Sequence, residues 1–287
     1  MAEVLGYEFY AMRHCILGTL LMLNMLSPVV AHGEDRTVVA TTTLLRAAIE
    51  DITGNRIAIH TLMPPGSCPG HFDLTVEQLA AIEKHGVVFA HGYEPYLPKL
   101  KDAVSNPRFR ICRIEEKRNW LIPEVYLDVV RKVERHLALC FPEDSIFFSR
   151  NLDNLIRKTN AFDMEIRKTV EESGLRKKRV ICNKFLEDLL AYLGLDVIAT
   201  YGRAEEMTPT ILAALVEAGR SKKVDIVIDN YQAGPDTGIF LAREFNVPHV
   251  VFSNFPGAFP GTENIRATLR ENVYRMKIAY GKHRQTQ

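Results

Sequence analysis

The most constraining feature of this sequence is a regular alternation of β-rich runs with helical runs, which begins at Thr37 and continues almost to the end of the chain. The β-rich runs, such as TVVA, VVFA, RVIC and DIVI, are nearly continuous in apolar and β-branched residues. Such runs are typical of strands that are buried on both faces, and helices between consecutive strands are the crossovers of a parallel sheet. Helical runs that close on Gly54 and Gly86 fit the usual C-terminal cap. The alternation therefore predicts an α/β fold with parallel sheets.

The alternation breaks once, after a charged IEEKRN segment. Residues 145–174 then carry apolar side chains at helical spacing. These side chains are Leu152, Leu155, Ile156, Phe162, Ile166 and Val170. The alternation resumes at Arg179 with the same plan. We therefore predict two doubly wound parallel-sheet α/β lobes joined by one long connecting helix. The predicted boundaries are 34–143 for the N-terminal lobe, 144–174 for the connecting helix and 175–287 for the C-terminal lobe.

The N-terminal part of the chain has the order of a secretory signal. Arg13 precedes the apolar run Ile16–Leu26, and Ala31 provides a small residue for cleavage. The apolar run is too short to span a bilayer as a helix. We therefore expect 1–33 to be a signal peptide, with Met12 as the true start, and the mature protein to be exported to the periplasm.

Composition and motifs narrow the function. The 287 residues include 36 basic and 35 acidic side chains, for a net charge of +1, so the chain lacks the basic excess that nucleic-acid binding requires. The sequence contains no GxSxG, GxxxxGK[ST], HExxH or GxGxxG motif, so serine hydrolases, P-loop proteins and dinucleotide enzymes receive no support. We expect a monomeric binding protein that is not an enzyme and does not bind nucleic acid.

The cysteines permit disulfides without specifying them. Cys68, Cys112, Cys140 and Cys182 remain after signal removal, and in an oxidising compartment they allow three connectivities. No CxxC pair is present, which argues against a structural zinc site. Buried thiols are an equally good interpretation of Cys140 and Cys182, which lie in apolar runs.

The loop PGSCPGHFD, between a strand-like and a helical run, offers His71 and Asp73 at the carboxyl end of a predicted strand. In open parallel sheets, ligands bind at this edge. Polar residues at or beyond the ends of other predicted strands are His91, Asn183, Glu205, Glu206, Asp229, Asn230 and Asn254. A single polar strand end is common in turns, but several at one edge predict a ligand cleft between the lobes.

The two-lobed plan, the long helix and the MPPGSCPGHFD loop together resemble the metal-binding solute-binding proteins of ABC transporters, the family serving zinc and manganese uptake. The segment VVFAHGYEPYLPKL is also similar to the strand and helix start that follow in that family. The resemblance covers roughly 37–280. It implies an exported protein that captures a divalent metal ion between its lobes and delivers it to an ABC-transporter membrane permease.

The resemblance also implies a set of four metal ligands. Carried over by position, they fall on His71, Glu124, Asn183 and Asn254, where the family has three histidines and one acidic residue. Counting back from the following helix would place the first ligand on Gly70 instead of His71. Asp73, Glu205, Glu206 and Asp229 are further candidates for a negative charge in the cleft.

These departures from the family pattern bear on the cargo. One imidazole, one carboxylate and two amides form a harder site than three histidines, so manganese or iron(II) is favoured over zinc. Two alternatives remain: a cleft that holds a small organic ligand or a metal chelate, and a chelatase-like or hydrolytic enzyme. Stoichiometric binding without turnover would distinguish a binding protein from an enzyme.

Overall fold

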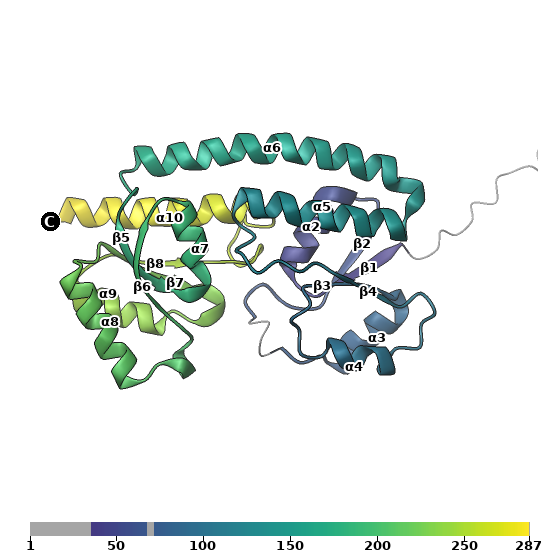
Figure 1. Ribbon diagram of the computed structural model, residues 1–287, viewed down its shortest axis with the longest axis horizontal. Helices are drawn as coiled ribbons and strands as arrows, with labels where there is room; N and C mark the ends of the chain where they lie inside the picture. Colours follow the sequence, from purple (N-terminus) through teal and green to yellow (C-terminus); the bar gives the residue numbers. More distant parts are fainter. Residues whose placement is uncertain (1–35, 68–71, 287) are drawn as a thin grey trace, which may run out of the picture. The chain divides into compact units, whose positions relative to one another are not determined.

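The computed structural model describes residues 36–67 and 72–286 (Figure 1). The described residues from Thr37 onward belong to one compact unit. The predicted signal peptide, Cys68 and His71 lie outside the described residues.

Two four-stranded sheets organise the compact unit, one in each lobe, and every pairing in them is parallel. The N-terminal sheet has the order β2-β1-β3-β4, from β1 (Thr37–Ala40), β2 (Ala58–Thr61), β3 (Val87–Ala90) and β4 (Arg110–Arg113). The C-terminal sheet has the order β6-β5-β7-β8, from β5 (Arg179–Asn183), β6 (Asp196–Tyr201), β7 (Ile226–Asn230) and β8 (His249–Phe252). The two sheets therefore repeat one topology.

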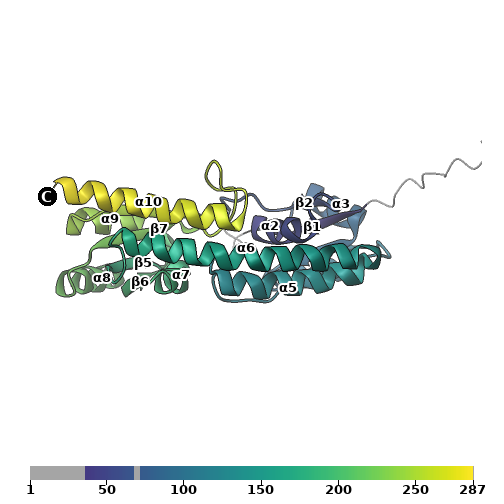
Figure 2. The same cartoon turned by 90° about the horizontal axis from the view of Figure 1, so that it is seen from above.

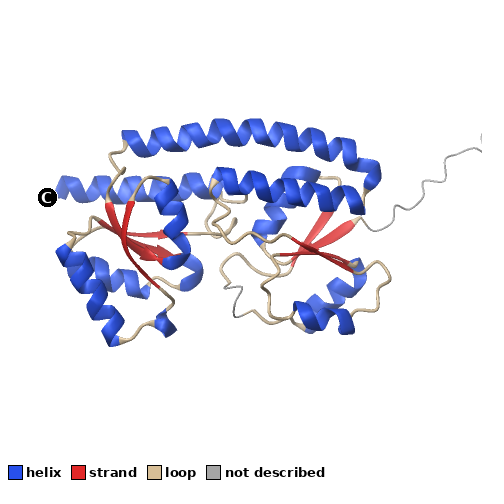
Figure 3. Cartoon of the chain, in the orientation of Figure 1, coloured by secondary structure: helices blue, strands red, loops and turns tan. Residues whose placement is uncertain are grey.

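Helices connect consecutive strands and cover both faces of each sheet (Figure 3). They are α2 (Thr43–Thr53), α3 (Val76–His85), α4 (Leu97–Ala103), α5 (Pro123–Cys140), α6 (Ser145–Glu172), α7 (Glu187–Tyr192), α8 (Pro209–Ser221), α9 (Asp236–Phe245) and α10 (Ile265–Thr286). Threonine caps begin several of them: the hydroxyls of Thr42, Thr75 and Thr208 accept hydrogen bonds from backbone N–H groups in the first turn.

The two-residue period of each strand separates the core into layers. In β5, Val180 and Cys182 face one layer, while Ile181 faces a second layer with Leu215 and Leu241 of α8 and α9. In the N-terminal lobe, Val39 and Val88 likewise face a separate layer under α3 and α4. Because both faces of each sheet are buried, the central strands are mostly apolar, and β3 is apolar at every position.

The long helix α6 packs along both lobes (Figure 2). Leu155, Phe162 and Val170 of α6 belong to one buried cluster that includes residues of both sheets. At the C-terminal lobe, Glu165 of α6 pairs with Arg270 of α10 at 3.1 Å. One continuous core therefore joins the lobes through α6, and the predicted fold class of two doubly wound lobes with a long connecting helix is confirmed.

Two further findings concern the described residues alone. None of their helices is both long and apolar enough to cross a membrane. Cys112, Cys140 and Cys182 are free thiols.

Candidate functional site

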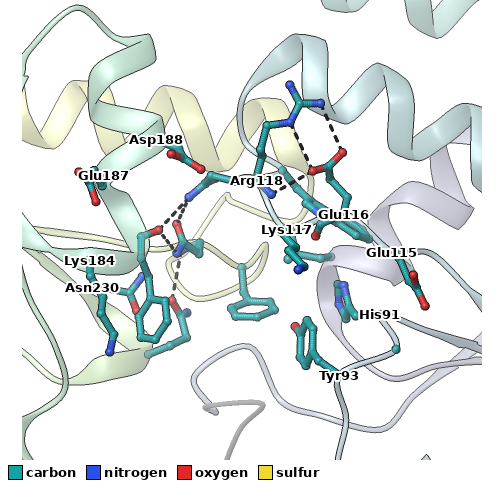
Figure 4. A pocket seen from close by; sticks show the side chains of 18 of the residues that line it. His91, Tyr93, Glu115, Glu116, Lys117, Arg118, Lys184, Glu187, Asp188 and Asn230 are labelled. Atoms are coloured by element: carbon teal, nitrogen blue, oxygen red, sulfur yellow. Dashed lines mark hydrogen bonds and ion pairs between the residues drawn. The ribbon is translucent and has the colours of Figure 1, made fainter. Parts of the chain in front are cut away.

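A cavity of about 770 Å³ lies between the carboxyl ends of the two sheets, with walls from both lobes (Figure 4). The N-terminal lobe contributes Leu44, His91, Gly92, Tyr93 and the segment 115–120. The C-terminal lobe contributes Lys184, Phe185, Glu187, Asp188, Arg203, Asn230, Gln232, Asn254 and Phe255. The ligand cleft expected at the strand ends is thus present as a partly open space with mixed polar and aromatic walls.

The turn after β3 fixes the N-terminal wall. Glu94 is buried. Its carboxylate accepts hydrogen bonds from the Thr41 hydroxyl at 2.6 Å, the backbone N–H of His91 at 2.9 Å and the backbone N–H of Gly92 at 2.8 Å. Gly92 adopts φ +99°, a conformation that side-chain-bearing residues rarely adopt. The buried carboxylate is therefore fully occupied in holding the loop that presents His91 and Tyr93 to the cavity.

His91 is a neutral imidazole in this wall. Burial lowers its pKa to about 4, against the opposing charge of Glu94. Its Nε2 lies 2.9 Å from the Thr42 hydroxyl. The ring stacks on Tyr93 with centroids 5.0 Å apart, and Trp120 packs against it at 4.6 Å. The result is an aromatic platform of His91, Tyr93 and Trp120.

Asn183 and Asn254, two of the four predicted ligands, take different positions in the C-terminal lobe. Asn183 is 1% exposed, caps the turn after β5 by accepting from Phe185 N–H at 3.1 Å, and donates to Gly202 O at 3.1 Å. Asn254 lines the cavity; its side chain accepts from Asn119 Nδ2 at 2.8 Å and donates to Phe185 O at 3.0 Å. Asn119 thereby connects the N-terminal wall to the C-terminal wall.

Four of the remaining predicted residues lie outside the cavity. Glu124 is exposed in the first turn of α5, and Asp73 and Glu205 are also exposed. Glu206 is exposed and pairs with Lys184 Nζ at 2.5 Å, which lowers the pKa of Glu206. None of these four residues lines the cavity described above.

Asp229 belongs to the interior of the C-terminal lobe. Its carboxylate is fully buried, where it accepts from the Tyr201 hydroxyl at 2.5 Å and lies 2.6 Å from His249 Nε2. Burial raises the pKa of Tyr201, with the Asp229 charge as a further cause, so the phenol remains the donor. Within residues 36–67 and 72–286, no group of three His, Cys, Asp or Glu side chains is placed to hold a metal ion. The ligand set His71, Glu124, Asn183 and Asn254 therefore stays a prediction.

Sequence reasoning missed most of the N-terminal wall. The segment between β4 and α5, residues 115–120, has only its charge as a sequence pattern, although it follows a strand end at the same edge as His91. The available signal was that position, together with Trp120, the one tryptophan in the chain. On the C-terminal side, Lys184, Phe185 and Gln232 follow predicted strand ends by one or two residues, so the same rule would have found them.

Asn230, the last residue of β7, is among the residues that line the cavity. The residue is 1% exposed, and its Nδ2 is buried without a hydrogen-bond partner among the described residues. A buried amide donor without an acceptor is destabilising by about 1–3 kcal/mol. Such a group points to an acceptor that a bound molecule supplies.

Two α/β lobes that face each other across a cavity and share one long connecting helix are the architecture expected of the solute-binding proteins that serve ABC transporters. A family profile described as "ZnuA: Zinc-uptake complex component A periplasmic" matches residues 38–279. The chain belongs to this family. The resemblance to metal-binding solute-binding proteins is thereby confirmed, and members of the family are transport components, not enzymes.

Curated relatives agree with this assignment. The "Manganese ABC transporter substrate-binding lipoprotein PsaA" of Streptococcus anginosus is 21% identical over 244 residues, covering 75% of this chain and 79% of the relative. The "Manganese ABC transporter substrate-binding lipoprotein scaA" of Streptococcus gordonii is 21% identical over 243 residues, covering 74% and 77%.

Solved structures agree with the fold. The crystal structure of ZnuA superimposes with a TM-score of 0.73 at 15% identity, over 86% of this chain and 100% of that one. The Mn-bound periplasmic metal-binding protein from Candidatus Liberibacter asiaticus superimposes with a TM-score of 0.71 at 12% identity, over 85% of this chain and 99% of that one.

Proposed function

We propose that this protein captures a divalent metal in the cavity between its lobes and delivers it to the membrane permease of an ABC transporter. The observation that carries the proposal is a cavity built from the strand ends of both lobes, in a chain of the zinc-uptake component A family. The names of the manganese transporter lipoproteins and the Mn-bound neighbour support a divalent metal as cargo. The protein works as a monomer and is exported by residues 1–33.

Manganese or iron(II) is the proposed metal, in preference to zinc. The ligands carried over from the family are His71, Glu124, Asn183 and Asn254, and amide and carboxylate oxygens suit hard divalent ions better than zinc. Asp73, Glu205, Glu206 and Asp229 are the further carboxylates considered for the site, and none of them lines the cavity in this structure.

The bonds of Asn254 suggest how cargo binding is coupled to lobe contact. Asn254 bonds to Asn119 across the cavity at 2.8 Å, so an ion bound at Asn254 competes with or joins that bond. When the cargo enters, the hydrogen bond between Asn119 and Asn254 is replaced by contacts from both lobes to the cargo. The bridged form is the one that docks on the permease.

Metal content and titration test the proposal. The protein is purified without a histidine tag, its metal content is measured by mass spectrometry, and the stripped protein is titrated with Mn(II), Fe(II) and Zn(II). Fluorescence of Trp120 reports the cavity directly, because Trp120 lines it and is the one tryptophan in the chain. We expect a single saturable site with Mn(II) or Fe(II) binding more tightly than Zn(II).

Variants link the site to named residues. His71→Ala should weaken binding by more than tenfold, and Glu124→Gln should weaken it as well, because each removes a proposed ligand. His60→Ala is the matched control, since His60 is an exposed histidine on β2 away from the cavity. A folded protein that none of the three metals binds or stabilises would refute the proposed function.

A further inference from the structure

We propose that the metal is bound in this cavity as a complex with a small planar organic chelator, not as a bare ion. This inference rests on the proposed function and specifies its cargo. The first reason is size: a divalent ion with six waters fills about 200 Å³ at about 30 Å³ per water. The cavity measures about 770 Å³, within the range of sites for organic ligands of about 300–1,000 Å³.

The second reason is the arrangement of charge. The acidic residues that line the cavity are Glu115, Glu116, Glu187 and Asp188. Glu115 and Glu116, the latter paired with Arg118, lie on the opposite side from Glu187 and Asp188 (Figure 4). They therefore do not converge on one point, in agreement with the lack of a three-residue metal cluster among residues 36–67 and 72–286. Lys117 also lines the cavity and makes none of the ion pairs found in the described part of the chain. Its ammonium group suits an anionic oxygen of a chelator and repels a bare cation.

The third reason is the Asn230 amide. A buried N–H donor without a partner is satisfied by an oxygen or nitrogen acceptor, which a bare cation cannot provide. An organic chelator carries such acceptors at its periphery. Asn230 therefore recognises the organic part of the cargo.

The fourth reason is that aromatic side chains line the cavity from both lobes. Tyr93 rests one ring face on His91 yet remains 55% exposed, and it lines the cavity from the N-terminal lobe. Phe185, 40% exposed, lines it from the C-terminal lobe. Lys184 and Arg203 already lie against the Phe185 ring. The exposed parts of Tyr93 and Phe185 provide apolar, polarisable contact area for a planar ring. The chemical class indicated is an aromatic ring that carries carboxylate or oxyanion donors to the metal.

The probe for this class is pyridine-2-carboxylate, a planar chelator with one ring nitrogen and one carboxylate. Its saturated counterpart, piperidine-2-carboxylate, has similar donors without a planar ring. The protein is titrated with Mn(II) alone, with each acid alone and with Mn(II) plus each acid, while Trp120 fluorescence and calorimetry record binding. We expect Mn(II) with pyridine-2-carboxylate to bind at least tenfold more tightly than Mn(II) alone, with the saturated acid giving no such gain.

Two variants identify the contacts. Tyr93→Ala should weaken binding of the aromatic complex about tenfold, and Tyr274→Ala, which alters an equally exposed tyrosine on α10, should not. Asn230→Asp replaces the amide donor by a carboxylate, so it should weaken the complex. The same variant should strengthen binding of a bare cation, because it adds a negative charge. The change in affinity therefore has opposite signs for the two kinds of cargo.

The outcomes separate this inference from the proposed function. If Mn(II) alone binds as tightly as the complex and Asn230→Asp strengthens it, the chelate inference fails and metal capture stands. If pyridine-2-carboxylate binds equally well without metal, the cavity binds the aromatic ring, but the proposal that the protein captures a metal fails. If neither metal nor complex binds to folded protein, both fail.

Discussion

His91 illustrates how one buried side chain makes stability depend on pH. Its pKa is about 4 in the folded protein, because burial disfavours the charged imidazole more than Glu94 favours it. The unfolded chain has the ordinary value of about 6.5. Above pH 6.5 both states are neutral and His91 adds no pH dependence. Between pH 6.5 and 4 only the unfolded state takes up the proton, so the folded state loses stability as the pH falls.

We predict that this loss reaches about 3 kcal/mol between pH 7 and pH 4. The measurement is the free energy of urea unfolding at pH 7 and pH 4 for the wild type and His91→Asn. Other groups titrate in both proteins, so the difference between them isolates His91. Equal pH dependence in the two proteins would show that His91 is not held neutral.

The cysteines should differ sharply in reactivity. A hydrogen bond from Cys112, with Arg110 nearby, lowers the pKa of the Cys140 thiol to about 7, and Cys140 is half-buried. Burial raises the pKa of Cys182, which has no exposed surface. The thiolate is the reactive form, so iodoacetamide at pH 7 should modify Cys140 well before Cys182.

Peptide mapping by mass spectrometry after timed labelling checks this order, and Arg110→Gln provides a variant with a less acidic Cys140 that should react more slowly. Labelling of Cys182 at the rate of Cys140 would contradict the buried position of β5. The same labelling on protein taken directly from its compartment shows whether Cys112 and Cys140 are still thiols there.

At the residue scale, sequence reasoning located the edge of the site better than its members. His91, Asn230 and Asn254 follow predicted strands and do line the cavity, because the carboxyl ends of parallel strands meet at one edge. Asn183 follows a strand equally closely, yet both ends of its amide bond to backbone groups. Which way a side chain turns after a strand depends on the turn it caps, and the sequence pattern does not specify that choice.

At the scale of elements, the packing of α9 on the C-terminal sheet depends on a glycine. A Cβ atom added at Gly238 would lie 1.9 Å from Asp229 Oδ2 and 2.7 Å from the Tyr201 hydroxyl. Both groups are fixed by their mutual hydrogen bond. We predict that Gly238→Ala destabilises the protein by about 2–3 kcal/mol, as overpacking of a rigid site does.

Urea unfolding measures this effect, with Gly281→Ala as the control. A Cβ at Gly281 in α10 meets nothing within 4 Å, so that substitution should not reduce stability. Similar stability for the two variants would mean that α9 can move away from β7 without loss.

The elements themselves were largely predictable, because apolar strands and amphipathic helices differ in period and length. The alternation from Thr37 onward predicts the order of strands and helices, and the spacing of Leu155, Phe162 and Val170 predicts the long helix α6. The segment 115–122 was not predictable in the same way. It has no period, and its position depends on contacts with the other lobe, such as the bond from Asn119 to Asn254.

At the scale of the whole compact unit, the two lobes are joined in two ways. One buried core continues from the N-terminal sheet through α6 to the C-terminal sheet. Across the cavity, Asn119 bonds to Asn254 at 2.8 Å and Gln232 bonds to Pro65 O at 2.8 Å. A wide hinge opening would have to bend α6, expose part of the shared core and break both bonds. A small rocking of the lobes breaks only the hydrogen bonds.

We therefore predict that cargo binding changes the distance between the lobes only slightly. Small-angle scattering of the stripped protein and of the cargo-loaded protein should give nearly superimposable profiles, because α6 packs on α2 and α5 of one lobe and on α10 of the other. Hydrogen exchange should then differ at 115–122 and 253–256, where the lobe–lobe bonds lie, and should remain slow throughout the buried face of α6. A large decrease in the radius of gyration on loading, with faster exchange in the middle of α6, would show that the helix is a hinge and not a rigid strut.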